Sequence, residues 1–348
     1  MLVESPPEAS TAVSSVPPGR GAARFLGLLA ALAVLVVMVL ASVAVGAHPT
    51  PLDEVWHGLF HYSGTPADVV VRDTRVPRTV LGLLVGSALG LSGAVMQSLT
   101  RNPLAEPGIL GVNAGAAAAV VSAISFLGAT SLSEFVWYAL GGAAIVSGAV
   151  YVLGGARGAT PVRLALAGTA ASAALVGYIN AVQLLDAAAL DKLRFWTVGS
   201  LASANMETVW QVLPFLGVGL VLALSLGRPL NAMAMGEDTA RALGAHITRT
   251  RISAMVAITL LCGAATAACG PIVFIGLMVP HLVLAITGPD MRWLLAYSAV
   301  LSPVLLLGAD IVGRVITRPA ELQVGIVTAL VGGPVFIHLV RRRKLAQL

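Results

Sequence analysis

Residues 75–115 read RVPRTVLGLLVGSALGLSGAVMQSLTRNPLAEPGILGVNAG, and this stretch decides the class of the protein. Between Arg78 and Arg101 no side chain carries a charge, over a length of about twenty residues that is enough to cross a hydrocarbon core of about 30 Å. The segment 102–105 that follows is a polar turn whose proline stops a helix. A second apolar run opens at Gly111. The stretch therefore predicts two membrane spans joined by a short turn.

Composition extends this conclusion to most of the chain. Hydrophobic residues make up 57% of the 348 and charged residues only 11%, whereas a soluble domain carries about 25% charged residues. The net charge of +5 does not indicate a nucleic-acid partner, because the basic residues lie in short loops and not along one face. We expect an all-α polytopic membrane protein, a bundle of about ten transmembrane helices. The expected spans are 25–45, 78–99, 111–129, 136–155, 162–184, 208–227, 252–270, 272–288, 293–312 and 323–340.

Two boundaries leave room for different structures. At Gly270 and Pro271 a helix breaker divides one long apolar stretch into two spans, or into a span and a re-entrant piece. The first apolar run is longer than the core of a signal peptide, about 7–15 residues, which favours a retained span over a cleaved one. Residues 1–20 lack apolar periodicity and predict a disordered cytoplasmic tail, so that the membrane domain covers 21–348.

Residues 48–74 are more polar and predict an external loop with one short helix. Within the loop, Asp53, His57 and His61 repeat every four residues and would share one face of that helix. The outer two would lie about 12 Å apart along the helix axis, so the three cannot bind one ion together. An amphipathic surface helix is the favoured interpretation, and we expect no metal site.

The distribution of basic residues predicts the orientation in the membrane. If the N-terminus is cytoplasmic, the loops on that side hold fourteen of the 21 Lys and Arg residues, which agrees with the positive-inside rule and places both termini in the cytoplasm. These fourteen are Arg20, Arg24, Arg101, Arg157, Arg163, Arg228, Arg241, Arg249, Arg251, Arg292, Arg341, Arg342, Arg343 and Lys344. The external arginines then need an explanation of their own.

Several blocks of the sequence resemble those of one transporter family. RVPR, GxxLGLSGAVMQ and NPLAEPGILGVNAGA lie within the opening stretch, and GPIVFIGLMVPHLVLAITGPD, LLLGADIVGR and QVGIVTALVGGPVFIHLV follow in the C-terminal third. These blocks are similar to the signature of the FecCD/BtuC-like permeases, the membrane subunits of bacterial ABC importers for iron-siderophore complexes, haem and vitamin B12. The resemblance implies the type II ABC importer permease fold. It also implies an assembly of two permease subunits, identical or different, with two ATPases and an external binding protein or lipoprotein.

The longest loop on the predicted cytoplasmic side, 228–251, holds the pattern GExxARxLG. Acidic residues lie where a helix N-terminus favours negative charge, and a glycine is placed to cap the C-terminal end of a short helix. The residues alone also fit a plain connector. The resemblance implies a coupling helix that docks on the ATPase, and the matching positions are Gly236, Glu237, Ala240, Leu243 and Gly244. The chain has no GxxxxGK[ST] loop, so we expect no enzyme here and assign ATP hydrolysis to the partner.

The resemblance also gives the external arginines a role. Arg75, Arg78 and Arg314 match family arginines that pair with glutamates of the binding protein. Arginine suits this role because its planar fork can hold a carboxylate in two parallel hydrogen bonds. The alternatives are snorkelling to lipid headgroups or, for Arg314, an i, i+4 ion pair with Asp310.

Two further pairs are candidates for the transport path. In the family, the positions that match Asn102 and Leu104 constrict the cytoplasmic exit, and the alternative for them is a rigid proline-containing turn. Asn180 and Gln183 lie three apart near the outer end of an apolar run. Polar side chains at membrane depth usually face a water-filled path or another helix, so these two line the substrate route or form an interhelical hydrogen bond.

The resemblance implies import of ferric siderophores by alternating access in the bacterial inner membrane, with haem or vitamin B12 as alternative cargo and no cofactor. A different class, an intramembrane serine protease, would use Ser92 as nucleophile and His281 as base, although small-residue helix packing explains the same GLSG sequence. An ion-driven secondary transporter would need an ionisable residue deep in a span. Asp310 is the candidate, but it lies near a span end, four residues from Arg314.

Overall fold

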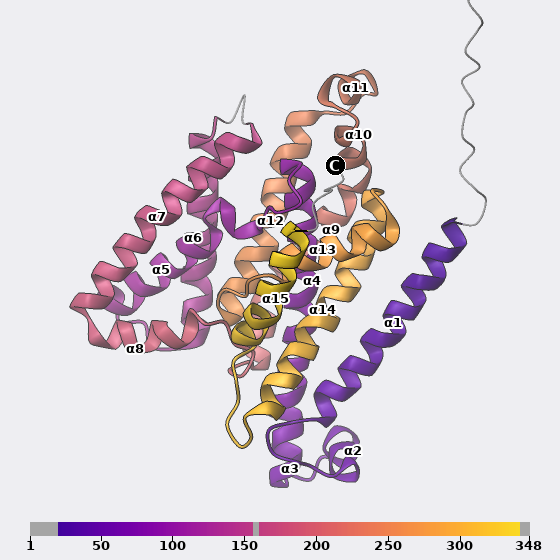
Figure 1. The fold of residues 1–348 in the computed structure, drawn as a ribbon. Coiled ribbons are helices and arrows are strands. Elements are labelled where there is room, and N and C mark those ends of the chain that lie inside the picture. Colours follow the sequence, from indigo (N-terminus) through magenta and orange to yellow (C-terminus); the bar gives the residue numbers. More distant parts are fainter. Residues whose placement is uncertain (1–19, 156–159, 342–348) are drawn as a thin grey trace, which may run out of the picture.

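The computed structural model describes residues 20–155 and 160–341, and within them the regular structure is helical (Figure 1). The tail expected at 1–20 lies outside the described residues except for Arg20, which begins the first helix. In chain order the elements are α1 (Arg20–Ala44), α2 (Leu52–Phe60), α3 (Pro66–Val69), the π-helix η1 (Val70–Arg75), α4 (Val76–Thr100), the 3-10 helix η2 (Pro107–Leu110), α5 (Val112–Leu127), α6 (Leu132–Leu153), α7 (Pro161–Leu185), α8 (Ala187–Trp196), α9 (Met206–Ser225), α10 (Gly227–Ala234), α11 (Glu237–Ala242), α12 (Ile247–Cys269), α13 (Ile275–Thr287), α14 (Met291–Ile316) and α15 (Val324–Arg341).

The expected bundle of about ten apolar helices is confirmed. Every predicted span coincides with a helix, namely α1, α4, α5, α6, α7, α9, α12, α13, α14 and α15. Seven helices of the described chain are long and apolar enough to cross a membrane, and α5, α13 and α15 contribute shorter apolar helices. The 13 residues of α13 span only about 20 Å. That length agrees with the alternative of a span followed by a shorter piece at the Gly270-Pro271 breaker.

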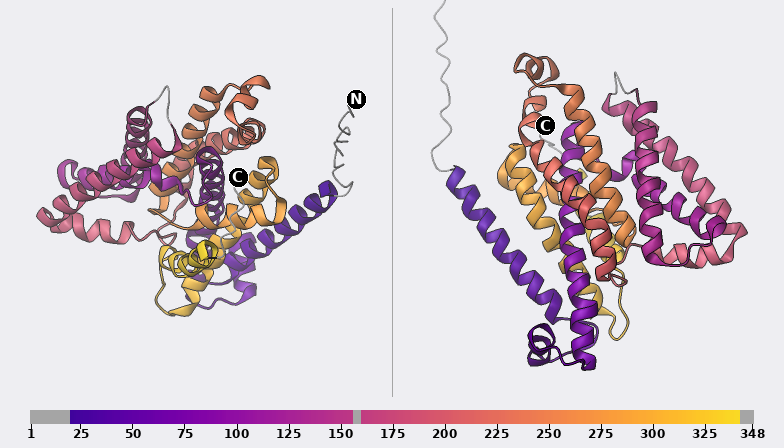
Figure 2. Two further views of the ribbon diagram at one scale, coloured as in Figure 1. Left: turned by 45° about the horizontal axis from the view of Figure 1, so that its top comes forward. Right: turned by 180° about the vertical axis from the view of Figure 1, so that it is seen from behind.

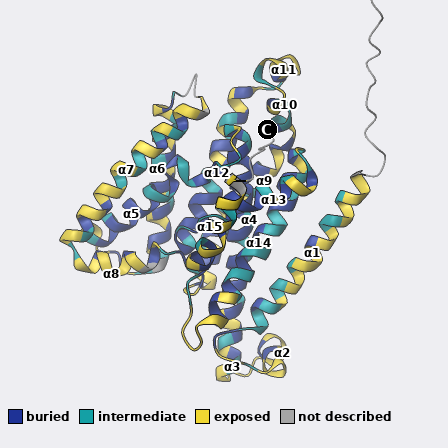
Figure 3. Ribbon diagram, viewed as in Figure 1, coloured by how far each residue is buried: buried dark blue, intermediate teal, exposed yellow. Residues whose placement is uncertain are grey.

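Helix α4 is the centre of the bundle and is buried along most of its length (Figure 3). It can lie there because its glycines let other backbones approach closely. A methyl group added at Gly86 would lie 2.5 Å from the Cα of Pro303 on α14, and one added at Gly82 would lie 2.6 Å from Leu307 of the same helix. Helices α4 and α14 therefore form a closely packed pair along the axis of the bundle.

The helix that contains α4 begins earlier than the apolar pattern predicts. The elements α3, η1 and α4 form one continuous helix from Pro66 to Thr100, whereas the sequence places the start of the span at Arg78. Pro77 would ordinarily stop a helix, because its ring meets the carbonyl four residues earlier. That carbonyl belongs to Asp73 in the π-helical turn η1, whose wider backbone accommodates the proline.

Helices α5 to α8 form a lobe beside the central helices, and α1 diverges from the bundle on the other side (Figure 1). The lobe packs on α12 through α5 and α6. The short helix α8 was not predicted, because it lies between two spans and has no long apolar run. Helix α7 leaves much of its apolar surface exposed, with Leu184 and Leu185 almost fully accessible.

The bundle has two distinct ends, which we name the α11 end and the α3 end. The α11 end carries α10, α11, the beginning of α1 and the end of α15 (Figures 1 and 2). The α3 end carries α2, α3, the end of α1 and the end of α14 (Figure 1). The beginning of α1 and the end of α15 thus lie on the same side of the bundle.

Candidate functional site at the two ends of the bundle

At the α11 end, the predicted short helix forms with the caps that its sequence indicates. Gly236 precedes α11 with φ +104°, a conformation that side chains rarely adopt. The amide of Gly244, at φ +80°, donates to the carbonyl of Arg241, and the amide of Ala245 donates to the carbonyl of Ala240. This pair of hydrogen bonds is a Schellman motif, so the helix ends at the glycine for the reason expected from sequence.

Side chains divide α11 into a buried and an exposed face. Ala240 is fully buried, whereas Leu243 is 64% exposed. Glu237 forms ion pairs with Arg241 at 3.1 Å and with Arg251 of α12 at 2.5 Å, which fix the short helix to the next long one. The result is a projection that an ion pair joins to α12 and that presents the apolar side chain of Leu243 to its surroundings.

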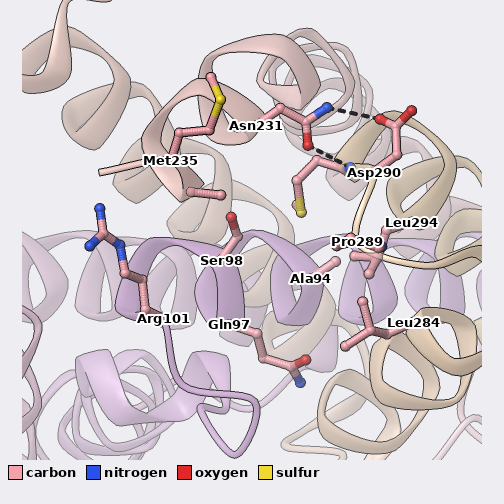
Figure 4. Close-up of a pocket in the computed structure, with 12 residues that line it drawn as sticks. Ala94, Gln97, Ser98, Arg101, Asn231, Met235, Leu284, Pro289, Asp290 and Leu294 are labelled. Carbon is pink, nitrogen blue, oxygen red and sulfur yellow. Dashed lines mark hydrogen bonds between the residues drawn. The ribbon is translucent and has the colours of Figure 1, made fainter. Parts of the chain in front are cut away.

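Helix α10 connects this projection to the inner helices (Figure 4). The side chain of Asn231 donates from Nδ2 to Oδ1 of Asp290 at 2.8 Å and accepts at Oδ1 from the amide of Met291 at 2.8 Å. Asp290 is the N-cap of α14 and also accepts from the amide of Arg292. Partial burial opposes ionisation of Asp290, but the hydrogen bonds from Arg292 and Asn231 outweigh it and lower the pKa of this carboxyl.

The turn after α4 holds the two predicted gate residues. Asn102 is exposed and Leu104 half-buried, and Oδ1 of Asn102 accepts a hydrogen bond from the Leu104 amide at 3.0 Å. The amide of Asn102 donates to the carbonyl of Gln97 at 3.1 Å. The alternative of a rigid turn is therefore present in the structure. It does not conflict with a gate, because the Leu104 side chain takes no part in these hydrogen bonds.

At the α3 end, two of the predicted docking arginines cap α1. The last carbonyls of a helix have no partner within the helix. Here the Ser42 carbonyl accepts from Arg314, and the carbonyls of Val43 and Ala44 accept from Arg75, at 2.8–3.1 Å. Both arginines are at least 97% buried, because Arg75 is 3% and Arg314 1% exposed. Their positive charge also suits the negative end of the helix dipole.

The third arginine completes a buried ionic cluster around Asp310. This carboxylate is fully buried and lies 2.8 Å from Nη2 of Arg78 and 2.5 Å from Nη2 of Arg314. The i, i+4 pair of Arg314 with Asp310, expected as an alternative, is thus present. Arg78 also contacts Glu321 at 2.6 Å, and the Glu321 side chain is 31% exposed. Of the three arginines, Arg78 alone contacts an acidic side chain that reaches the surface in the described structure.

In this geometry the predicted docking arginines already have partners within the chain. In the described conformation the guanidinium groups of Arg75 and Arg314 contact acceptors within the chain, so neither is available as it stands to a carboxylate of a partner. The sequence could not reveal this, because the acceptors on α1 lie 31 to 272 positions away along the chain. Asp310 likewise has two arginine partners within the chain.

The remaining sequence candidates lie apart from these clusters. Asn180 is exposed and Gln183 half-buried on α7, on the helix with the large accessible apolar surface. Ser92 is fully buried, and its hydroxyl donates to the Leu89 carbonyl at 3.0 Å. Within the described residues no hydrogen bond joins Ser92 to His281, so the geometry gives the protease hypothesis no support.

The candidate metal row on α2 has a different partner. His57 lies 3.1 Å from the buried carboxylate of Asp68, which joins α2 to α3. The described residues contain no group of three His, Cys, Asp or Glu side chains placed to hold a metal ion. Asp68 also caps the turn at 63–65, so this cluster shapes the loop.

Sequence reasoning missed Asn231, Asp290 and Glu321. Asp290 had a usable signal, because an aspartate directly before an apolar run is a typical helix N-cap. Asn231 and Glu321 had none, since each finds its partner at least 59 positions away.

The architecture matches that of known transporters. An ABC transporter of the metal-chelate type, solved in an inward-facing conformation, superposes with a TM-score of 0.81 at 26% identity. The match covers 92% of this chain and 100% of the other. A bundle of about ten apolar helices with a capped helix projecting at one end is thus a polytopic membrane permease of the ABC-importer fold.

The chain belongs to the FecCD transport family, whose pattern matches residues 34–342. It is 47% identical to the ferric enterobactin transport system permease protein FepD of Escherichia coli (strain K12), over 90% of this chain and 94% of that protein. It is 38% identical to the iron(3+)-hydroxamate import system permease protein FhuB of Bacillus subtilis (strain 168), over 91% of this chain and 83% of that one. The sequence-based assignment to this family is confirmed.

Proposed function

We propose that this chain is the membrane subunit of an ATP-driven importer of ferric siderophores. The observation that carries the cargo class is the 47% identity to a ferric enterobactin permease over nearly the whole of both chains. The partners are a separate ATPase, an external binding protein and a second permease subunit. Transport proceeds by alternating access, in which ATP-driven movement of the ATPases opens the central path to one side and then to the other.

The α11 end is the cytoplasmic end in this proposal. Helices begin or end there with basic residues, as the positive-inside rule requires of a bacterial inner-membrane protein. The described basic residues at this end include Arg24, Arg101, Arg163, Arg228, Arg241, Arg249, Arg251, Arg292 and Arg341. Helix α11 with its exposed Leu243 is then the ATPase docking element, built from the five residues predicted for it. Both termini lie on the cytoplasmic side.

The exposed face of α7 is the proposed position of the substrate path and of the second permease subunit. Its apolar side chains include Leu184 and Leu185, which are 88% and 87% exposed, and its polar side chains include Asn180 and Gln183. A surface that mixes large apolar and amide side chains at membrane depth suits a partner helix and a polar path between the two chains.

The direct test is uptake into proteoliposomes that contain this permease, its second subunit, the ATPase and the binding protein. We expect ATP-dependent accumulation of a radioactive ferric siderophore, with little competition from haem or cobalamin in excess. Preferential uptake of cobalamin or haem would assign the alternative cargo. Uptake that persists without the ATPase and collapses with the ion gradient would overturn the proposal altogether.

Docking of the binding protein at the α3 end is proposed to use Arg78 after release of Glu321. Glu321 occupies one side of the Arg78 guanidinium as an incoming carboxylate would, and its own side chain is partly exposed. A partner carboxylate can therefore replace Glu321 while Asp310 keeps Arg78 in place. Arg75 and Arg314 instead fix the end of α1 beside this position.

We predict that Glu321→Gln speeds association with the binding protein several-fold, because it removes a competing negative charge from the docking face. Stopped-flow association at two salt concentrations measures this, and the gain should shrink at high salt. The matched control is Glu207→Gln, an exposed carboxylate at the start of α9, which should leave the rate unchanged. An unchanged rate in Glu321→Gln would remove Arg78 from the docking surface.

We predict that Leu104→Ala raises passive leak through the permease, because a smaller side chain widens a constriction at the cytoplasmic exit. The turn itself should survive, since its hydrogen bonds come from the backbone and from Asn102. Release of preloaded siderophore from proteoliposomes without ATP measures the leak, with Leu127→Ala at the exposed end of α5 as control. A leak equal to wild type, with normal assembly, would leave Asn102 and Leu104 as a structural turn.

A further inference from the structure

The coupling loop has a specific attachment to the interior of the bundle. Asn231 is the centre of that attachment, because both polar atoms of its amide bond to the first residues of α14. One bond reaches the capping carboxylate of Asp290, and the other satisfies the amide of Met291, which has no partner within its own helix. The N-terminus of α14 is thus completed by a side chain from α10.

A second attachment joins α10 to α4. Nη2 of Arg101, the residue that ends α4, donates to the carbonyl of Met233 near the end of α10 at 2.6 Å. Arg101 adopts the left-handed conformation with φ +49°, which is uncommon for a residue other than glycine. The chain therefore holds this arginine in a less favourable backbone state at the point where it reaches the coupling loop.

These polar contacts bridge a cavity. A space of about 630 Å³ lies between α10 on one side and, on the other, the last turns of α4, the end of α13 and the first turn of α14 (Figure 4). Asn231 and Asp290 border it at one place and Arg101 at another. Helix α10 also packs on the bundle through the buried Leu230 and Met233. Beside the cavity this packing is interrupted, and there the hydrogen bonds of Asn231 and Arg101 supply the direct contacts between α10 and the helices α4 and α14.

The two helices that receive these contacts are themselves joined along their length. Gly82 and Gly86 bring α4 against α14, and at the far end Asp310 of α14 binds Arg78 of α4 inside the protein. A displacement of the ends of α4 and α14 that lie at the α11 end is therefore transmitted to the α3 end, because the two closely packed helices cannot shift much against each other.

We propose, building on the function proposed above, that Asn231 and Arg101 fasten the coupling loop to the α4–α14 pair. Through these two residues α10, the end of α4 and the beginning of α14 move as one body when the ATPase displaces α11. Asn231 is a positioning residue in this mechanism. It touches neither cargo nor nucleotide. Its effect is on how much of the movement that the ATPase imposes on α11 reaches the α3 end.

The first test exchanges the two groups of the Asn231–Asp290 contact. Asn231→Asp places two carboxylates against each other, and transport per ATP hydrolysed should fall about tenfold or more, while the ATPase still co-purifies. The double variant Asn231→Asp with Asp290→Asn again faces one carboxylate with one amide, and should recover most of the lost coupling. Asn205→Asp is the matched control, because Asn205 caps α9 from an exposed position and aspartate caps equally well.

Wild-type coupling in Asn231→Asp, or a correctly assembled double variant without recovery, would overturn the proposal. If Asn231→Asp does not fold, Asn231→Leu serves in its place, and wild-type transport per ATP in that variant would have the same meaning. Absence of uptake by the wild-type complex would instead count against the proposed function, so the two failures are distinguishable.

A second measurement does not depend on the cargo. Spin labels at Asp238→Cys on α11 and Pro289→Cys before α14 report the distance across the fastening, in a background with the buried Cys262 and Cys269 replaced by alanine. In the permease–ATPase complex this distance should be the same with and without trapped ATP, and Asn231→Leu should make it change between the two states. A wild-type distance that shifts on ATP trapping would show that α11 and α14 move separately, and would overturn the proposed fastening.

Discussion

Asp310→Ala is expected to remove about 3–5 kcal/mol of stability, the usual cost of leaving buried charges without their partner. Two buried guanidinium groups pair with this carboxylate, that of Arg314 and that of Arg78, which has Glu321 as a second acidic partner. Each guanidinium group would keep its other hydrogen bonds, but its buried positive charge would have less negative charge beside it. The loss should appear as a large drop in the unfolding midpoint of the detergent-solubilised permease and in the yield of folded protein.

The control for Asp310→Ala is a carboxylate in an ion pair of similar geometry at the surface. Asp238 lies 2.7 Å from Arg241, but its side chain is fully exposed, so Asp238→Ala should leave the midpoint unchanged within error. Asp310→Asn should fall between the two, because an amide oxygen still accepts hydrogen bonds but carries no charge. An Asp310→Ala midpoint equal to wild type would mean that the cluster does not stabilise the fold.

The same cluster limits what charge reversal can show about docking. Arg78→Glu would place a second carboxylate beside Asp310, and Arg75→Glu would leave the last carbonyls of α1 without their donor. Both changes act on folding before they act on any partner. The Glu321→Gln variant is therefore the better probe of the docking face, since it leaves Arg75, Asp310 and Arg314 untouched.

The second large effect is expected at the opposite end. Leu243→Asp should abolish co-purification of the ATPase and with it ATP-driven uptake, because binding would bury an unpaired carboxylate at a cost of several kcal/mol. The permease alone should fold normally, since this side chain is 64% exposed and contributes little to the core. Pull-down of the ATPase by tagged permease, beside the unfolding midpoint of the permease itself, separates the two effects.

Leu243→Ala gives the graded comparison. It removes the apolar contact without adding a charge, so the ATPase should bind more weakly than to wild type and more tightly than to Leu243→Asp. Normal retention of the ATPase by Leu243→Asp would refute the assignment of α11 as the docking element. The contacts of Asn231 would then have no ATPase-driven movement of α11 to transmit.

The sequence by itself determined the membrane class, the positions of the ten apolar helices and the local shape of the coupling loop. These features depend on short-range physics: uncharged length decides a span, and a glycine at positive φ ends α11 where the pattern places it. The family followed for the same reason, because its signature blocks are continuous stretches of chain.

Only the tertiary structure decided what the charged and amide side chains do. The sequence placed Arg75 and Arg314 at the external side, but the end of α1 brings them carbonyl groups that no local pattern indicates. Asn231 and Asp290 meet across 59 positions, and Arg78 meets Glu321 across 243. A polar group in a membrane bundle must find a partner, and which partner it finds is set by how the helices pack, so residue type alone left these roles undecided.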